Sequence, residues 1–228
     1  MPKRKKQTPI RDSINWVETS EWFTTPKQSR SRASMQRVYD SALRLFAEKG
    51  FDSTTPADIA KAAGVTTGSI YNRFLDKEAI LYTIIDTFSK SRVPEVTRLC
   101  DPQVWRNRPA DEILSMYIEM MFSAYQHDAN VIRIIERRRL VDPAIARKIS
   151  DLNEHVVSSF STLLSHQSEQ SISSVKKKFR VLHTLIRGFL VHRILADPGV
   201  PEHDLPISHP DFKAMAMTLA LNTLKKSV

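Results

Sequence analysis

The chain has 228 residues, a formal net charge of +9 and 41% apolar residues, a composition typical of a globular protein with a sizeable core. Only five glycines occur and alternating β-branched residues are rare, so an all-helical fold is expected. The one cysteine, Cys100, excludes an intrachain disulfide and a multi-cysteine zinc site. No apolar run of roughly 18 residues and no signal-peptide pattern are found. We therefore expect a cytoplasmic protein that needs no cofactor or metal and enters no membrane.

The first 31 residues form a basic arm without helical periodicity. Residues 1–33 hold eight basic and three acidic side chains, whereas residues 34–92 hold eight and seven. This excess indicates a polyanionic partner. Two roles are open: Lys3-Arg4-Lys5-Lys6 and Arg11 follow phosphates or enter a minor groove, or the arm only solubilises the chain. Three aromatic residues also leave open whether the arm docks on the body: Trp16, Trp22 and Phe23.

Two helices are predicted after the arm. Apolar residues that recur every three or four positions predict an amphipathic helix over residues 34–49. The next helix begins with Thr55 as its N-cap and Pro56 at its first position, and Gly64 ends it because glycine accepts the left-handed conformation.

Two further helices follow. One is predicted from the cap Thr66 through Phe74, and the other from the cap Asp76 towards Pro94. The outward positions of the first carry small hydroxyls, an amide and a phenol in place of a solubilising charged face. Such a surface is expected where a helix meets another molecule.

A set of residues recurs at fixed spacings over about residues 32–92: Lys49-Gly50-Phe51, Thr54-Thr55, Asp58-Ile59-Ala60, Ala63-Gly64-Val65, Thr66, Gly68, Tyr71, Phe74 and Lys77-Glu78. With these residues at these spacings, the stretch resembles the N-terminal domain of the tetracycline-repressor (TetR) family of bacterial transcriptional regulators. The resemblance implies a helix-turn-helix, in which one helix braces a second that enters the major groove. The spacing of four between Ile70 and Phe74 places both on the buried face of this second helix.

The resemblance and the outward positions together give nine candidate DNA-contacting residues. They are Thr55, Thr66, Thr67, Gly68, Ser69, Tyr71, Asn72, Arg73 and Lys77. By resemblance, Thr66, Tyr71 and Lys77 contact phosphates, which fix the register of a protein on DNA. The hydroxyls and the amide of Thr67, Ser69 and Asn72 suit base edges, and Arg73 suits either.

Some of these assignments have simpler alternatives. Many TetR relatives carry Lys where Thr67 stands and His or Tyr where Asn72 stands, so this chain departs from the commonest pattern at both positions. Tyr71 is alternatively a half-buried helix aromatic, Thr66 only a cap, and Lys77 a solvated charge. Gly68 is unfavourable inside a helix, which makes sense where backbone comes close to a phosphate or base.

The C-terminal half contains a predicted helix over residues 113–125 with apolar residues on every side, as expected of a buried helix. In the TetR family a helix in this region lines a cavity for a small-molecule effector, although plain core filling is the other open role. The candidate effector-binding residues are Met116, Tyr117, Met120, Met121, Tyr125, Phe160, His183 and Phe189. The run Arg137-Arg138-Arg139 is expected to be solvated, and binding of an anionic ligand or of the DNA flank is the alternative.

The last two predicted helices, residues 173–195 and 210–225, each carry two apolar stripes. In the first, Leu185, Leu190 and Ile194 form the additional stripe. One stripe suits the core of the chain and the other needs a partner. The resemblance implies that these two helices of each subunit form a four-helix homodimer interface.

The sequence therefore predicts an all-α protein with a basic arm (1–31), a three-helix helix-turn-helix domain (32–92) and a helical ligand-binding and dimerisation domain (93–228). The predicted function is that of a homodimeric transcriptional regulator, and members of this family are most often repressors. The dimer is expected to bind a near-palindromic double-stranded DNA operator and to be released from it by a small-molecule effector. The alternative is a sequence-tolerant architectural DNA-binding protein that acts through its arm. An enzyme is disfavoured, since the chain lacks paired carboxylates, a metal-ligand cluster, a phosphate-binding glycine loop and a nucleophile elbow.

Overall fold

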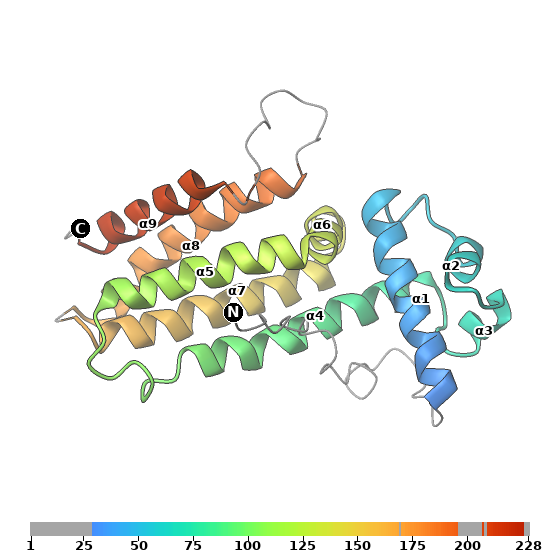
Figure 1. Ribbon diagram of the computed structural model, residues 1–228, viewed down its shortest axis with the longest axis horizontal. Coiled ribbons are helices and arrows are strands. Elements are labelled where there is room, and N and C mark those ends of the chain that lie inside the picture. Colours follow the sequence, from blue (N-terminus) through green and yellow to red (C-terminus); the bar gives the residue numbers. More distant parts are fainter. Residues whose placement is uncertain (1–28, 169, 196–206, 208, 226–228) are drawn as a thin grey trace, which may run out of the picture.

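The computed structural model describes residues 29–168, 170–195, 207 and 209–225, and within these residues all regular structure is helical (Figure 1). The helices are α1 (Ser29–Glu48), α2 (Pro56–Ala63), α3 (Thr67–Tyr71), α4 (Lys77–Leu99), α5 (Ala110–His127), α6 (Ala129–Arg138), α7 (Pro143–Ser165), α8 (Ile172–Leu195) and α9 (Pro210–Lys225). Helix α1 begins at Ser29, before the predicted start at residue 34. The basic residues and aromatics of the predicted arm up to residue 28 lie outside the described residues.

Helices α1 to α3 form a small unit at one end of the molecule, on the right in Figure 1. Its core includes Phe46 of α1, Ile59 of α2 and Ile70 of α3, each at most 1% exposed. Arg37 of α1 donates from Nε to the carbonyl oxygen of Ala63 at 3.0 Å, where α2 has carbonyls without helical partners. The three helices are thus joined by apolar packing and by a cation at the C-terminus of α2.

Helix α2 has the ends that the sequence predicts. The side chain of Thr55 accepts from the backbone N–H of Asp58, and the carboxylate of Asp58 accepts from the backbone N–H of Thr55, which is a capping box. Gly64 follows with φ at 64°, in the left-handed region, and the N–H of Val65 donates to the oxygen of Ala60 at 3.0 Å. This turn sets the angle between α2 and α3.

Helix α3 is shorter than predicted. It ends at Tyr71, and not at Phe74, although the N–H of Phe74 still donates to the oxygen of Ile70 at 2.9 Å. The N–H of Arg73 donates to the same carbonyl, so the helical ladder breaks where one oxygen takes two donors. The shortening leaves Phe74 buried at 2% exposure, as its four-residue spacing from Ile70 predicts.

Helix α4 extends beyond its predicted end. It starts at the predicted cap, where Asp76 accepts from the N–H of Ala79 at 2.7 Å, but it continues through Pro94 to Leu99. A proline inside a helix removes one hydrogen bond, and packing of the helix against α7 outweighs that loss. Because α4 runs across the predicted domain boundary at residues 92 and 93, the unit formed by α1 to α3 and the bundle are joined by one continuous helix.

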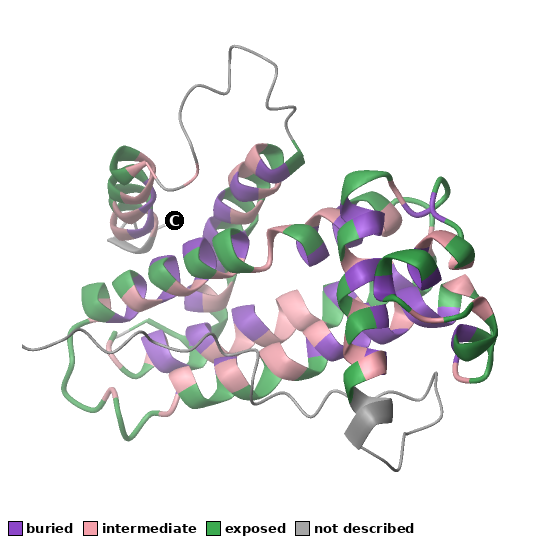
Figure 2. Ribbon diagram, turned by 45° about the vertical axis from the view of Figure 1, so that its right-hand side comes forward, coloured by how far each residue is buried: buried purple, intermediate pink, exposed green. Residues whose placement is uncertain are grey.

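Helices α4, α5 and α7 to α9 form an elongated bundle, and α6 lies between this bundle and α1 (Figure 1). Helix α5 is not apolar all round, as Glu119 lies on an exposed side and pairs with Lys213 of α9. In α8, Leu190 and Ile194 of the additional stripe are buried in the core, whereas Leu185 of the same stripe is exposed, so the two predicted stripes do not separate into one inner and one outer face. Figure 2 shows the buried residues of these helices on their inner sides.

The part of the chain that the structure describes contains no helix long and apolar enough to cross a bilayer. The same residues contain no group of three or more His, Cys, Asp or Glu side chains placed to hold a metal ion.

Candidate nucleic-acid interface and core cavity

The predicted DNA-contacting residues lie on one continuous stretch around α3, from the cap of α2 to the first turn of α4. Six of them are exposed: Thr55, Thr66, Gly68, Ser69, Tyr71 and Asn72. The other three are half-buried: Thr67, Arg73 and Lys77. The stretch therefore offers backbone, hydroxyls, an amide and a phenol to a partner, with two cations at its edge.

The hydroxyls in this stretch are already ordered by helix caps. Thr55 donates to the carboxylate of Asp58 at 2.7 Å, and this hydrogen bond is the main reason that the pKa of Asp58 is lowered. Thr66 accepts from the N–H of Ser69 at 3.2 Å, and its hydroxyl lies 2.8 Å from the Ser69 hydroxyl. Both predicted caps exist, and each fixes the position of an exposed hydroxyl.

Tyr71 and Gly68 have surroundings that favour contact with an external molecule. The Tyr71 side chain is 54% exposed, which is more than expected for the alternative of a half-buried aromatic. A Cβ added at Gly68 would meet only the Thr66 hydroxyl at 3.9 Å, so nothing in the described chain requires a glycine there. A glycine that costs helix stability without an internal packing reason is consistent with close approach from outside.

Lys77 is bound within the protein and is not the freely solvated charge of the simplest alternative. Its Nζ donates to the carbonyl oxygen of Phe51 at 2.9 Å and lies 4.2 Å from the centre of the Phe51 ring. Arg138 of α6 places its guanidinium carbon 4.6 Å from the centre of the same ring. Phe51 thus links the first turn of α4 to α6.

The predicted solvation of the run Arg137-Arg138-Arg139 holds for Arg137, which is exposed, but not for Arg138 and Arg139, which are half-buried. Arg137 donates to the oxygen of Ala47 in α1 at 3.4 Å, and Arg139 donates from Nε to Glu136 at 2.6 Å. The run contacts the DNA-binding unit on one side and the bundle on the other, a role that depends on the packing of distant helices and leaves no local trace in the sequence.

A cavity of about 90 Å³ lies among α4, α5, α6, α7 and α8. Four of the eight predicted effector-binding residues line it: Met120, Met121, Tyr125 and His183. The other four do not. Tyr117 and Phe160 form a fully buried aromatic cluster with Phe179, with ring centres 4.8 to 5.5 Å apart. Phe189 packs on Phe212 at 4.9 Å, and Met116 is half-buried outside the cavity wall.

The cavity wall also holds charged residues that sequence reasoning missed. Glu136 of α6, 4% exposed, pairs with Arg187 of α8 and with Arg139. Arg92 of α4 pairs with Glu95 and with Asp128. In the sequence, Glu136 stands among the isoleucines of this amphipathic helix. That position could have indicated a buried carboxylate with a cationic partner, because buried charges need partners.

His183 lies in a defined hydrogen-bonded chain. Its Nδ1 lies 3.0 Å from the Tyr117 hydroxyl, and its Nε2 lies 3.3 Å from Oδ1 of Asn153. A neutral ring that accepts from Tyr117 and donates to Asn153 satisfies both contacts. Burial lowers the pKa of His183 to about 4, and the cations Arg187 and Arg180 add to this effect, so the ring is neutral at pH 7.

The arrangement defines an all-helical protein with a helix-turn-helix unit attached to a helical bundle. Residues 38–83 match the family described as bacterial regulatory proteins, tetR family. The chain is 33% identical over 130 residues to the HTH-type transcriptional regulator AcrR of Shigella flexneri, covering 57% of this chain and 56% of that protein. Residues 38–83 are therefore similar to the tetR-family regulatory segment, and the relatives named here are transcriptional regulators.

Two further comparisons give similar proteins, one by sequence and one by fold. The chain is 45% identical over 60 residues to the HTH-type transcriptional repressor KstR2 of Rhodococcus jostii, covering 24% of this chain and 29% of that protein. A tetR-family regulatory protein from Rhodococcus RHA1 has the same fold, with a TM-score of 0.64 at 17% identity over 86% of this chain and 98% of that one. The matched segments span about half or less of the curated relatives' own length.

Proposed function

We propose that the protein is a homodimeric, ligand-responsive transcriptional regulator that acts in the bacterial cytoplasm. Two copies of α3 bind successive major grooves of a near-palindromic operator, and a small molecule in the core cavity favours a conformation that releases the DNA. Repression is the expected sign, in keeping with relatives such as KstR2, which is named a transcriptional repressor.

One observation carries the DNA-binding proposal: the exposed face of α3 has ordered polar groups and no solubilising charge. Within α3 itself, Thr67, Gly68, Ser69 and Tyr71 supply this face, and none of them is charged. Hydroxyl, amide and phenol groups held at fixed positions suit both phosphates and base edges.

The proposal is tested with DNA sequences selected from a random pool by the purified full-length protein. Tyr71→Ala removes an exposed side chain, and we expect at least tenfold weaker binding to the selected DNA. For Lys77→Ala both the DNA affinity and the melting temperature are measured. The melting temperature is needed because Lys77 also contacts Phe51, so its loss can destabilise the fold. Arg106→Ala, an exposed cation in the connection between α4 and α5, is the charge-matched control for Lys77→Ala.

Unaltered DNA binding by Tyr71→Ala would contradict the site assignment. Footprinting separates the regulator from the architectural alternative, because a short protected palindrome supports the regulator and broad coverage supports the alternative.

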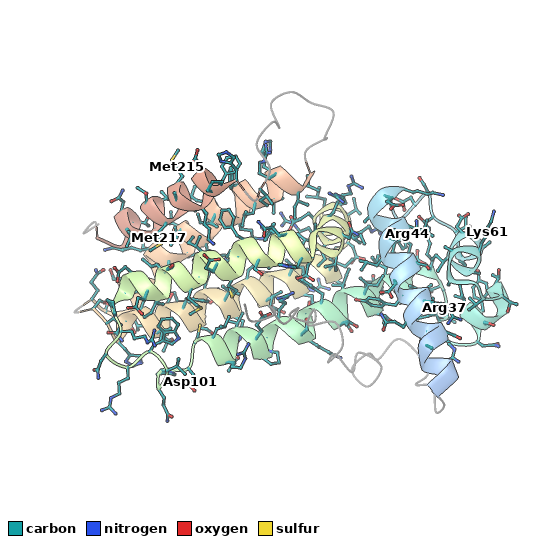
Figure 3. All side chains as sticks on the ribbon, in the orientation of Figure 1. Arg37, Arg44, Lys61, Asp101, Met215 and Met217 are labelled. Atoms are coloured by element: carbon teal, nitrogen blue, oxygen red, sulfur yellow. The ribbon has the colours of Figure 1, made fainter. Side chains whose placement is uncertain are left out.

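The homodimer part of the proposal is supported by exposed apolar side chains on α8 and α9. On α8, Val181 and Leu185 are 52% and 50% exposed, and on α9 Met215 is 74% exposed. Figure 3 shows Met215 and Met217 on different sides of α9, and Met217 packs against the core. A Cβ at Gly188 of α8 would meet nothing within 4 Å, which leaves room for the close approach of a second helix.

The effector part of the proposal is supported by the position of α6. This helix presents Glu136 to the cavity, and its last residues, Arg137 and Arg138, contact the DNA-binding unit. A ligand that displaces the Glu136 side of α6 therefore moves groups that touch Ala47 and Phe51.

A further inference from the structure

We infer that the core cavity binds a small apolar carboxylate, with its carboxylate group at the Tyr125 hydroxyl and the Arg187 guanidinium. This inference rests on the proposed effector-dependent function and adds the chemical class of the effector. Its basis is an unpartnered donor, a local excess of positive charge and the apolar character of the remaining wall.

The unpartnered donor is the hydroxyl of Tyr125. The Tyr125 side chain lines the cavity and is only 7% exposed, yet its hydroxyl makes no hydrogen bond with the described residues. The hydroxyl is not among the fully buried atoms of the described residues, so it is open to the cavity and a ligand atom there can accept a hydrogen bond from it. Burial also raises the pKa of Tyr125, which keeps the hydroxyl protonated and able to donate.

The charges next to Tyr125 favour an anionic acceptor. Glu136 is held by two guanidinium groups, those of Arg139 and Arg187, so this three-residue cluster carries one more positive than negative charge, with Glu136 and Arg187 on the wall and Arg139 behind it. His183, which also lines the cavity, is neutral and does not alter this balance. A carboxylate supplies the missing negative charge and accepts from Tyr125 and Arg187 together.

The α4 wall has the opposite balance. There Arg92 is held by two carboxylates, those of Glu95 on the wall and of Asp128 behind it, in the connection between α5 and α6. A carboxylate ligand would be repelled from this wall and attracted to the Tyr125 wall, so the charge pattern also orients it.

The rest of the cavity suits a short hydrocarbon chain. Ile132, Ile135 and Ile149 line it together with Met120 and Met121. A dry apolar cavity of about 150 Å³ holds benzene, so a cavity of about 90 Å³ suits a molecule of no more than about six non-hydrogen atoms. Butanoate meets this limit and is the probe of choice.

The test follows the methionine methyl signals of the full-length protein by nuclear magnetic resonance during titration with butanoate, butanamide or butylammonium. We expect butanoate to shift the signals of Met120 and Met121 saturably and to leave that of exposed Met215 in place. Butanamide should bind about tenfold more weakly or worse, since it lacks the charge, and butylammonium should not bind.

Two tyrosine variants on α5 test whether the Tyr125 hydroxyl contacts the carboxylate of butanoate. Tyr125→Phe should weaken butanoate binding about tenfold or more, because it removes one hydrogen bond to a charged group. Tyr117→Phe is the comparison on the same helix: Tyr117 does not line the cavity itself and its hydroxyl bonds the lining residue His183, so the loss of butanoate affinity should be much smaller than with Tyr125→Phe. Melting temperatures of both variants show that they fold.

Equal affinity for butanoate and butanamide, unaltered binding by Tyr125→Phe, or no saturable shift with butanoate would each overturn the inference. DNA binding by the same wild-type sample is measured without butanoate. Retained DNA binding together with a failed butanoate titration refutes only the effector class, whereas absent DNA binding refutes the proposed function.

Discussion

His183 shows at the scale of one residue how burial makes stability depend on pH. The ring is 5% exposed, and it packs between Tyr117 of α5, Asn153 of α7 and the cations of α8. Its pKa in the folded state is about 4, below the ordinary value of 6.5. Because the unfolded chain takes up this proton first, the stability that His183 contributes is complete above pH 6.5 and is lost as the pH falls towards 4.

We therefore expect the free energy of unfolding of the wild type to fall by about 2 kcal/mol more than that of His183→Gln between pH 7 and pH 5. Urea titrations at pH 7, 6 and 5 measure this difference, and glutamine serves because it does not titrate. Parallel pH profiles for the two proteins would show that the ring is protonated equally in the folded and unfolded states.

Helix caps could be predicted from the sequence, whereas the different roles of the two tyrosines on α5 could not. Caps such as Thr55 and Asp76 depend on neighbours three residues away, so local patterns identify them, and both are present. Tyr117 and Tyr125 lie two helical turns apart on one helix, and the sequence does not distinguish them. Only the packing of α7 and α8 places Tyr117 in an aromatic cluster and Tyr125 on the cavity.

At the scale of elements, the starts of α3 and α4 were predicted and their ends were not, whereas for α1 the end was predicted and the start was not. The start of α4 is fixed by its cap at Asp76, whereas its end depends on tertiary contacts that carry it through Pro94. Tyr82 of α4 donates to Asp142, the N-cap of α7, at 2.7 Å, and Asp86 pairs with Lys148 of α7. These contacts join residues some 60 positions apart, which is why local periodicity did not show them.

The contact of α6 with the DNA-binding unit gives a prediction for an element. Arg138 is mostly buried against Phe51, and its Nη1 lies 3.5 Å from Asp52. Arg138→Ala removes a cation–π contact and the packing of a long side chain. We therefore expect the free energy of unfolding to fall by about 1–2 kcal/mol. Amide hydrogen exchange should accelerate in the segment around Phe51, while Arg138→Lys, which keeps the cation, should have a smaller effect.

Arg106→Ala is again the control, since Arg106 is exposed in the connection after α4. Faster exchange throughout α1 to α3 in the control would mean that the effect is not specific to α6. Unchanged exchange around Phe51 in Arg138→Ala would remove α6 as the link between the cavity and the DNA-binding unit.

At the scale of the whole molecule, the exposed faces of α8 and α9 are predicted to hold two copies together. In a two-fold interface each side chain occurs twice, so one substitution places two charges near the dimer axis. Leu185→Glu should give a monomer at micromolar concentration, because burying unpaired carboxylates costs several kcal/mol. Light scattering after size-exclusion chromatography measures the mass.

Leu140→Glu is the matched control, because Leu140 is 76% exposed in the connection between α6 and α7, away from α8 and α9. It should remain a dimer with unaltered DNA affinity. Leu185→Glu should also lose most of its affinity for a palindromic site while keeping weak binding to a half-site, since its α3 is intact and only the pairing of two reading helices is lost. A monomeric variant that binds the full palindrome as tightly as the wild type would show that dimerisation is not what sets the spacing of the two α3 helices.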